Sequence, residues 1–233
     1  MKYIYCLLLV LLVSNEINAQ ERKNKFSFGL KVNPFFSWLK TEPAYWNSTI
    51  ENKGSHFGYS YGIFSEYYFT KNVGLSAELR AAHFRYQYTF RHEMVVDTIP
   101  PPETIMGMNR NAELNYIEFP LALKIRSNPK GNFRFYGQFG FAPAINLSAK
   151  ANDTFFTYSA GDIVENNKNI KKEINKNASS ILVGTGLEYQ FMPSAALLFG
   201  LTYHAGYKNL LDVSYREFDS KISYLAINFG AIF

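Results

Sequence analysis

Residues 133–141 and 181–191 read FRFYGQFGF and ILVGTGLEYQF, with large apolar side chains at alternate positions. Successive side chains of a β-strand point to opposite faces of the sheet, so this period of two predicts strands with one apolar and one polar face. Similar rows recur along the chain. They occupy residues 26–32, 57–69, 73–79, 117–125, 197–207 and 225–233. The pattern therefore predicts eight strands and an all-β fold.

One of these rows changes phase. Its apolar residues are Val73, Leu75 and Leu79, followed by Phe84 and Tyr86. A β-bulge sets two residues of one strand opposite one residue of its neighbour and exchanges the faces beyond it. We predict such a bulge between the two halves of this row.

The connections between the predicted strands alternate in length. The long ones cover residues 41–55, 91–112, 150–178 and 208–219, and the short ones cover residues 71–72, 127–132 and 192–195. Because antiparallel neighbours alternate in direction, all short connections fall at one end, as in outer-membrane barrels with short periplasmic turns. We predict an eight-stranded antiparallel up-and-down transmembrane β-barrel with both chain ends on the periplasmic side.

The amino terminus predicts export. Lys2 precedes an apolar run over residues 3–13, and Ile-Asn-Ala at residues 17–19 ends the segment, which is the layout of a secretory signal peptide. The apolar run is shorter than the roughly 20 residues that a transmembrane helix needs. We predict a cleaved signal peptide over residues 1–19, a barrel domain over residues 20–233, and a location in the outer membrane of a Gram-negative bacterium.

The composition excludes several classes of function. Aromatic residues make up 17% of the 233 residues and charged residues only 18%, against roughly 25% charged residues in average soluble domains. The net charge of +5 comes from scattered lysines and arginines, which argues against nucleic-acid binding. The single cysteine, Cys6, lies in the predicted signal peptide, which excludes thiol chemistry and cysteine-based metal sites from the mature chain. We expect no cofactor, no metal and no catalytic residues.

Charged residues lie on the face opposite the apolar rows. They are Lys31, Glu66, Glu78, Arg80, Glu118, Lys124, Arg126, Arg134 and Glu188. The lumen of an eight-stranded barrel is narrow and filled by side chains. An unpaired buried ion costs several kcal/mol, so we expect these charges to pair across the lumen.

Aromatic residues near the predicted strand ends suggest anchoring at the membrane interfaces. Trp38, Trp46 and the terminal Phe233 are the candidates. Lysines in the connection at residues 150–178 could contact anionic lipopolysaccharide, although a solvated run of charges is the ordinary interpretation. Outer-membrane lipid and lipopolysaccharide are therefore the expected partners.

Two alternatives to a non-enzymatic membrane barrel remain open. A soluble periplasmic barrel of the lipocalin kind would place the apolar rows inside. A lipid-modifying hydrolase could use Ser60, in the sequence Gly-Tyr-Ser-Tyr-Gly at residues 58–62, together with His83 and Glu66. That sequence lies within a predicted strand and lacks the strand-to-helix turn of a nucleophile elbow.

The segment YIEFPLALK at residues 116–124, followed by FYGQFGF at residues 135–141, resembles the PorT-like outer-membrane β-barrel family. Residues 57–62 and 182–189 look like further strands of that family. The resemblance implies an outer membrane protein beta-barrel domain, association with secretion in some members, and no catalytic residues. The last strand, residues 224–233, looks like the strand that the barrel-assembly machinery recognises, which adds that machinery and secretion or envelope proteins to the expected partners.

Overall fold

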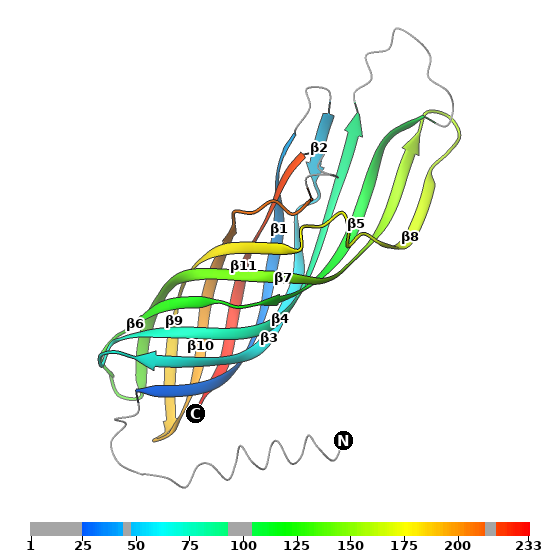
Figure 1. Cartoon of the computed structure of the whole chain (residues 1–233). Coiled ribbons are helices and arrows are strands. Elements are labelled where there is room, and N and C mark those ends of the chain that lie inside the picture. The colour runs from blue at the N-terminus through cyan, green and yellow to red at the C-terminus, as the bar shows by residue number, and fades with distance from the viewer. Residues whose placement is uncertain (1–24, 44–47, 93–103, 213–217) are drawn as a thin grey trace, which may run out of the picture.

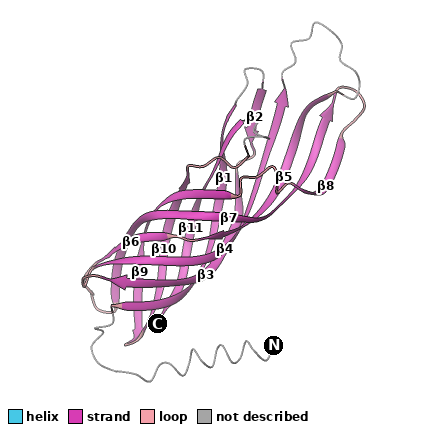
Figure 2. Ribbon diagram, in the orientation of Figure 1, coloured by secondary structure: helices cyan, strands magenta, loops and turns pink. Residues whose placement is uncertain are grey.

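The computed structural model describes residues 25–43, 48–92, 104–212 and 218–233. The predicted signal peptide at residues 1–19 and Trp46 lie outside these ranges. Within them, every regular element is a strand (Figure 2). The strands are β1 (Phe26–Pro43), β2 (Ser48–Asn52), β3 (Ser55–Tyr68), β4 (Val73–His92), β5 (Ile105–Glu118), β6 (Leu121–Arg126), β7 (Phe133–Thr157), β8 (Ile163–Asn169), β9 (Asn177–Met192), β10 (Ala195–Gly206) and β11 (Phe218–Ile232). No helix in the described ranges is long and apolar enough to cross a membrane.

The strands form a closed antiparallel barrel (Figure 1). The first strand, β1, pairs with β3 on one side and with the last strand, β11, on the other. Two barrel strands are interrupted. The first interruption separates β5 from β6 at Pro120, which has no N–H to donate, and both strands keep one register with β4. The second separates β2 from β3 at Lys53-Gly54. Counting each interrupted pair once, and leaving out β8, which pairs only with β7, gives the predicted eight barrel strands.

The strands are longer than a membrane crossing requires. A transmembrane strand needs about 9–11 residues, whereas β4 has 20 residues and β7 has 25. The excess rises beyond the barrel at the end with the long connections, at the upper right of Figure 1, where β8 pairs with the end of β7. The predicted long loops at 91–112 and 150–178 were therefore too long, since β5, β7 and β8 occupy much of them.

The predicted bulge in β4 was wrong. Its pairing with β3 and β5 continues without a register shift, so the same face points inward from Gly74 to Phe90. The outward face carries Leu75 and Leu79, and the inward face carries Phe84 and Tyr86. Along this regular strand, the apolar residues therefore lie on the outer face up to Leu79 and on the inner face from Phe84. The register shifts lie elsewhere: two between β5 and β7, one between β7 and β8, and one between β9 and β10.

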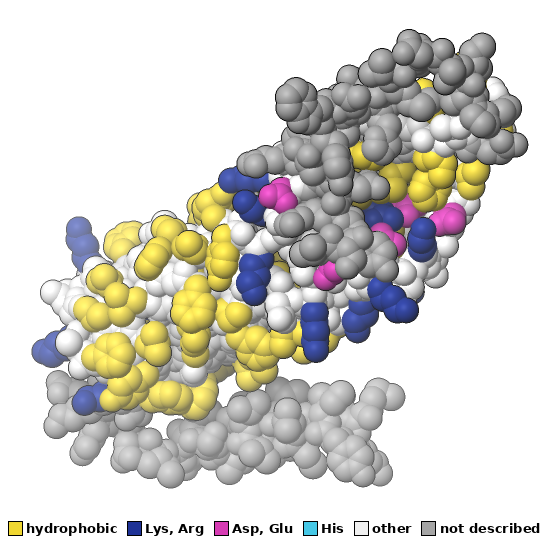
Figure 3. Space-filling view, turned by 45° about the horizontal axis from the view of Figure 1, so that its top comes forward, with side chains coloured by type: hydrophobic (Ala, Val, Ile, Leu, Met, Phe, Trp, Pro, Cys, Tyr) yellow, Lys and Arg dark blue, Asp and Glu magenta, His cyan; other side chains and the backbone are white. Residues whose placement is uncertain are grey.

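This change of face divides the molecule into two parts. In the membrane section, the outward rows of every barrel strand are apolar and exposed, and the inner face is polar. In the outer extension, made of residues 84–92, 105–114 and 148–169, the inner face is mainly apolar, apart from Arg110 and Asp153. Its outer face is mainly polar, although Ile105, Ile163 and Val164 are also exposed. Figure 3 shows hydrophobic side chains spread over the barrel end of the molecule, with Lys and Arg side chains next to them and a smaller hydrophobic group at the other end. The apolar rows face outward, which contradicts the lipocalin alternative.

We expect a charge to be costly on the outer surface of the membrane section and tolerated on that of the outer extension. Phe139 is 60% exposed on the apolar surface, so Phe139→Arg should destabilise the barrel in lipid vesicles by about 2–4 kcal/mol, the usual cost near the midplane. Asn111→Arg, on the outer face of β5, should change stability by less than about 0.5 kcal/mol. Equal effects in urea unfolding of the two reconstituted variants would contradict the two-part division.

Candidate functional site

The lumen of the membrane section holds two groups of ion pairs. The first surrounds Lys124 on β6, whose side chain is 1% exposed. Its Nζ donates to Glu66 Oε1 of β3 at 2.6 Å and lies 2.6 Å from Glu188 Oε1 of β9. The Tyr68 hydroxyl donates to the other oxygen of Glu66 at 2.8 Å. One ammonium thus joins three strands on different sides of the barrel.

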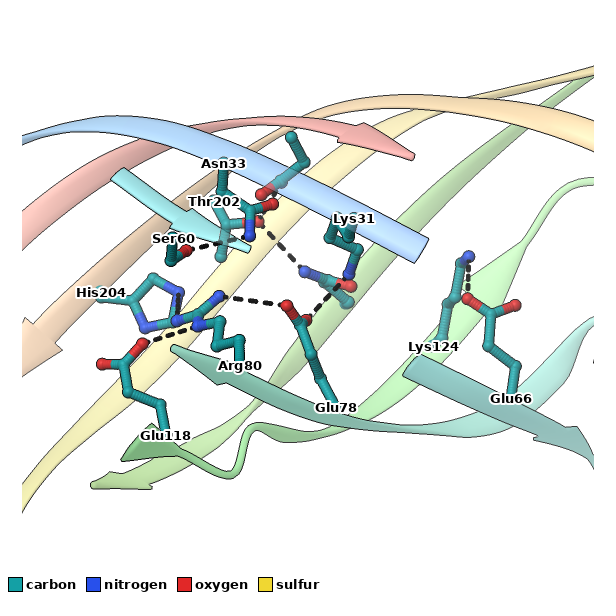
Figure 4. A network of polar contacts seen from close by, with 12 residues as sticks. Lys31, Asn33, Ser60, Glu66, Glu78, Arg80, Glu118, Lys124, Thr202 and His204 are labelled. Atoms are coloured by element: carbon teal, nitrogen blue, oxygen red, sulfur yellow. Dashed lines mark hydrogen bonds and ion pairs between the residues drawn. The ribbon is translucent and has the colours of Figure 1, made fainter. Parts of the chain in front are cut away.

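The second group surrounds Arg80 on β4 (Figure 4). Its Nε donates to Glu118 Oε2 at 2.6 Å, and its Nη1 lies 3.6 Å from Glu78 Oε1. Lys31 Nζ donates to Glu78 Oε2 at 3.0 Å, and the Tyr224 hydroxyl donates to Glu118 at 3.2 Å. These contacts link β1, β4, β5 and β11 across the lumen, and all the ionised side chains are at most 6% exposed.

Two of the predicted lumen charges lie outside these groups. Arg126 donates from Nε to the carbonyl of Lys71 and lies over the ring of Tyr68, at the end with the short turns. Arg134 is partly exposed, and neither arginine forms an ion pair with another described residue. The remaining seven of the nine predicted charges take part in the two groups.

Side chains fill the space between the ion pairs. A cavity of about 10 Å³ lies between Lys31, Glu78 and Arg80, which is room for one water molecule at most. A cavity of about 40 Å³ lies above Glu118 and Tyr224 and has room for about three water molecules. Glycines at 186 and 200 make space for a larger group, because a Cβ at either position would meet the Tyr136 side chain. The lumen is therefore packed around its charges.

The proposed hydrolase residues do not meet. Ser60 faces the lumen, where its hydroxyl accepts a hydrogen bond from Asn33 at 3.0 Å. His83 lies on the opposite face of the sheet, with Nδ1 2.8 Å from Asn115 Oδ1, and Glu66 is bound to Lys124. The structure thus contradicts a site made from Ser60, His83 and Glu66.

A different serine–histidine pair, which the sequence did not reveal, lies in the lumen. His204 Nδ1 is 3.1 Å from Ser180 Oγ, and His204 Nε2 is 3.3 Å from Arg80 Nη2. A guanidinium can only donate hydrogen bonds, so Nε2 accepts and a neutral His204 carries its proton on Nδ1. The imidazole then donates to the serine and cannot take its proton. Residues 180 and 204 lie on adjacent strands, a proximity that only the register between β9 and β10 reveals.

The outer extension contains a third buried charge group. Arg110 on β5 donates from Nε and Nη2 to the two oxygens of Asp153 on β7, at 2.7 and 2.6 Å. Its Nη1 donates to Glu173 at 2.7 Å. Burial lowers the pKa of Arg110, but the hydrogen bonds to Asp153 more than offset this and hold the pKa above its ordinary value. Burial also raises the pKa of the nearby Tyr86 hydroxyl well above its ordinary value.

Two connections close the opening of the barrel at this end. Residues 170–176 and 207–212 are joined by a β-bridge between Ile174 and Leu211 and by a backbone hydrogen bond from Asp212 to Glu173. Their apolar side chains are buried against the inner face of the outer extension. They are Ile170, Ile174, Leu210 and Leu211. Glu173 links this closure to Arg110, so the opening is covered by packed chain.

The predicted interfacial aromatics that the structure describes lie at the two ends of the apolar surface. Trp38 points outward from β1 and stacks on Tyr203 of β10, with ring centroids 6.0 Å apart. Phe233 is 54% exposed at the opposite end, where the chain ends (Figure 1). Among the described residues, no three His, Cys, Asp or Glu side chains are grouped to hold a metal ion.

Comparison of the sequence with protein-family models identifies the family of this chain. Residues 18–206 match the family model described as "Outer membrane protein beta-barrel domain". The chain belongs to this family. In an outer membrane protein beta-barrel domain, the lipid bilayer covers the apolar rows on the outer surface of the barrel. Among the curated proteins, no sequence matches the chain.

Several solved structures are similar to this outer membrane protein beta-barrel domain. Neisserial surface protein A is 12% identical, with 88% of this chain and 95% of that chain covered and a TM-score of 0.44. OprG from Pseudomonas aeruginosa is 14% identical, with 90% and 97% covered and a TM-score of 0.44. Ail, the attachment invasion locus protein of Yersinia pestis, is 14% identical, with 90% and 99% covered and a TM-score of 0.39.

Proposed function

We propose that this outer-membrane barrel is a non-enzymatic binding or anchoring protein that acts through its outer extension and not through an open lumen. The packed lumen carries this proposal: ion pairs around Lys124 and Arg80 bridge it at two levels, and Ile174 and Leu211 help to cover its outer opening. Diffusion would require all three layers to open. The strands that continue beyond the membrane section hold a surface in a fixed position outside the bilayer.

The resemblance to PorT-like proteins supports a finer proposal, in which the bound partners are secretion or envelope proteins. The outer extension suits this role because its core is buried and its outer face is mainly polar, with a few exposed apolar side chains such as Ile163 and Val164. The serine–histidine pair at 180 and 204 does not favour an enzyme. Arg80 donates to His204 Nε2 and so leaves the proton on Nδ1, the nitrogen that faces Ser180 and that a general base would need free. A deletion strain tests this finer proposal: altered secreted or surface proteins would support it, and an unchanged set would contradict it.

Conductance tests the closed lumen. We expect the purified protein to give no steady conductance in planar bilayers, because the cavities between the ion pairs have room for only a few water molecules. A triple variant that removes only the middle layer, Arg80→Ser with Glu78→Ser and Glu118→Ser, should also stay closed if it folds, because the Lys124 group and the closing connections remain. A shift in gel migration on boiling would show that the variant has folded. Steady conductance of the unmodified protein would contradict the proposal.

A further inference from the structure

Basic side chains form a belt where the apolar outer surface ends. The belt consists of Lys40, Lys53, Arg85, Lys150, Lys176, Lys208 and Lys221. Register makes Lys40 the direct partner of Lys221, and it places Arg85, Glu113 and Lys150 side by side on β4, β5 and β7. Figure 3 shows Lys and Arg side chains gathered between the hydrophobic surface and the rest of the molecule. The belt lies beyond the outer edge of the bilayer's apolar core.

Most of the belt is not neutralised within the part of the chain that the structure describes. Lys53 pairs with Glu51 at 3.3 Å, and Arg85 pairs with Glu113 at 3.1 Å. The other five form no ion pair with a described residue. A layer of negatively charged groups next to the outer surface would neutralise these five side chains.

The pair Lys40–Lys221 is the clearest element of the belt. The two lysines are direct partners across β1 and β11, on the outer face of the barrel. Like charges directly opposite each other destabilise a sheet. Asp219, two residues from Lys221, accepts a hydrogen bond from Asn209 at 3.0 Å. An anion from outside the chain would remove the repulsion between the two ammonium groups.

The aromatic pair next to these lysines sets their depth. Trp38 is two residues before Lys40 on the same strand and stacks on Tyr203. Trp and Tyr rings favour the boundary between acyl chains and headgroups. Two residues along a strand span about 7 Å, which places the lysines at headgroup level. A ligand here would have acyl chains beside the apolar rows and negative charge beside the belt.

We propose that the belt, with Lys40 and Lys221 at its centre, binds the phosphate groups of a phosphorylated glycolipid in the outer leaflet. The site is independent of the proposed role of the outer extension. The phosphates lie between the ammonium groups, and the acyl chains cover the apolar rows below Trp38 and Tyr203. Such binding would fix the depth of the barrel in the membrane.

The test measures binding of diphosphorylated lipid A to the full mature chain in detergent, with native mass spectrometry as the readout. We expect Lys40→Gln with Lys221→Gln to weaken binding about 30-fold, since each lysine near an anionic surface contributes about a fivefold factor. Lys40→Arg with Lys221→Arg should retain binding. Lys71→Gln with Lys130→Gln makes the same change of charge at the opposite end and should have little effect.

Removing the phosphates from lipid A provides a second measurement on the unmodified protein. We expect dephosphorylated lipid A to bind as weakly as the phosphorylated lipid binds to the double glutamine variant, and inorganic phosphate alone not to compete. Equal binding with and without phosphates would overturn the proposal, as would equal losses in the two glutamine double variants. Displacement by inorganic phosphate would overturn the choice of a lipid as the ligand.

Discussion

Replacing Lys124 with methionine should destabilise the barrel by about 3–5 kcal/mol or prevent its folding, because two buried carboxylates would lose their common partner. Glu66 and Glu188 are at most 6% exposed, and each lies 2.6 Å from the Lys124 ammonium. The measurement is urea unfolding in lipid vesicles, followed by tryptophan fluorescence and by gel migration with and without boiling. A stability equal to that of the unmodified protein would contradict the central role of this ion pair.

A neutral triple variant separates lost charge pairing from lost packing. Lys124→Met with Glu66→Gln and Glu188→Gln removes all three charges and keeps side chains of similar length. Replacing a buried ionic group as a whole is often neutral or stabilising, so we expect the triple variant to recover most of the loss. Lys130→Met, in an exposed turn, serves as the control and should change stability by less than about 0.5 kcal/mol. No recovery in the triple variant would mean that packing around Lys124 dominates.

Replacing Arg110 with methionine should loosen the outer extension and leave the membrane section intact. The side chain of Asp153 is fully buried and would lose both hydrogen bonds from Arg110, at a cost of about 3–5 kcal/mol. Glu173 would lose its hydrogen bond to β5, and this hydrogen bond joins the closing connections to the strands of the outer extension. Hydrogen exchange measured by mass spectrometry should become faster in residues 105–116, 148–157 and 170–176.

The expected pattern is local because no contact of Arg110 reaches the two lumen groups. Exchange in residues 181–191, which belong to the membrane section, should not change. Arg110→Met with Asp153→Leu should restore part of the protection, since the buried carboxylate is then absent. Arg85→Met breaks an exposed ion pair on the outer face of the same region and should have little effect. Uniformly faster exchange along the chain would contradict separate stability of the two parts.

The period of two was sufficient to predict eight barrel strands, because in the membrane section one outward face meets lipid and must be apolar. The same assumption produced the errors. Phe84 and Tyr86 of β4 were assigned to the outer face because they are apolar, although beyond the membrane apolar residues belong inside. The end of β7 was interpreted as loop because its outward residues Lys150 and Asn152 are polar and its inward residues Ala149 and Ala151 are small. Most of β8 was included because residues 165–169 are polar.

The charges in the lumen could be named from the sequence, but their partners could not. Lys124 meets Glu66 and Glu188 because the strands are staggered around the barrel, and no short segment encodes that stagger. Arg126 and Arg134 illustrate the limit. Arg134 lies directly opposite Glu188 in register, but Glu188 pairs with Lys124, and Arg126 donates to the carbonyl of Lys71. His204 and Arg110 were missed because neither stands in a recognisable motif; register alone brings them to Arg80 and Asp153.

Along β4 and β7 the apolar residues change from the outer face to the inner face, and this change also determines how far the protein extends above the membrane. Residues 148–157 of β7 would span about 34 Å if fully extended at about 3.4 Å per residue. A buried apolar core and the ion pairs of Arg110 hold this part of β7 against its neighbours. The turn at its end therefore stands on packed strands and not on a flexible linker. A partner would meet the turn between β7 and β8 well above the headgroups, at a height set by the number of residues in the strands.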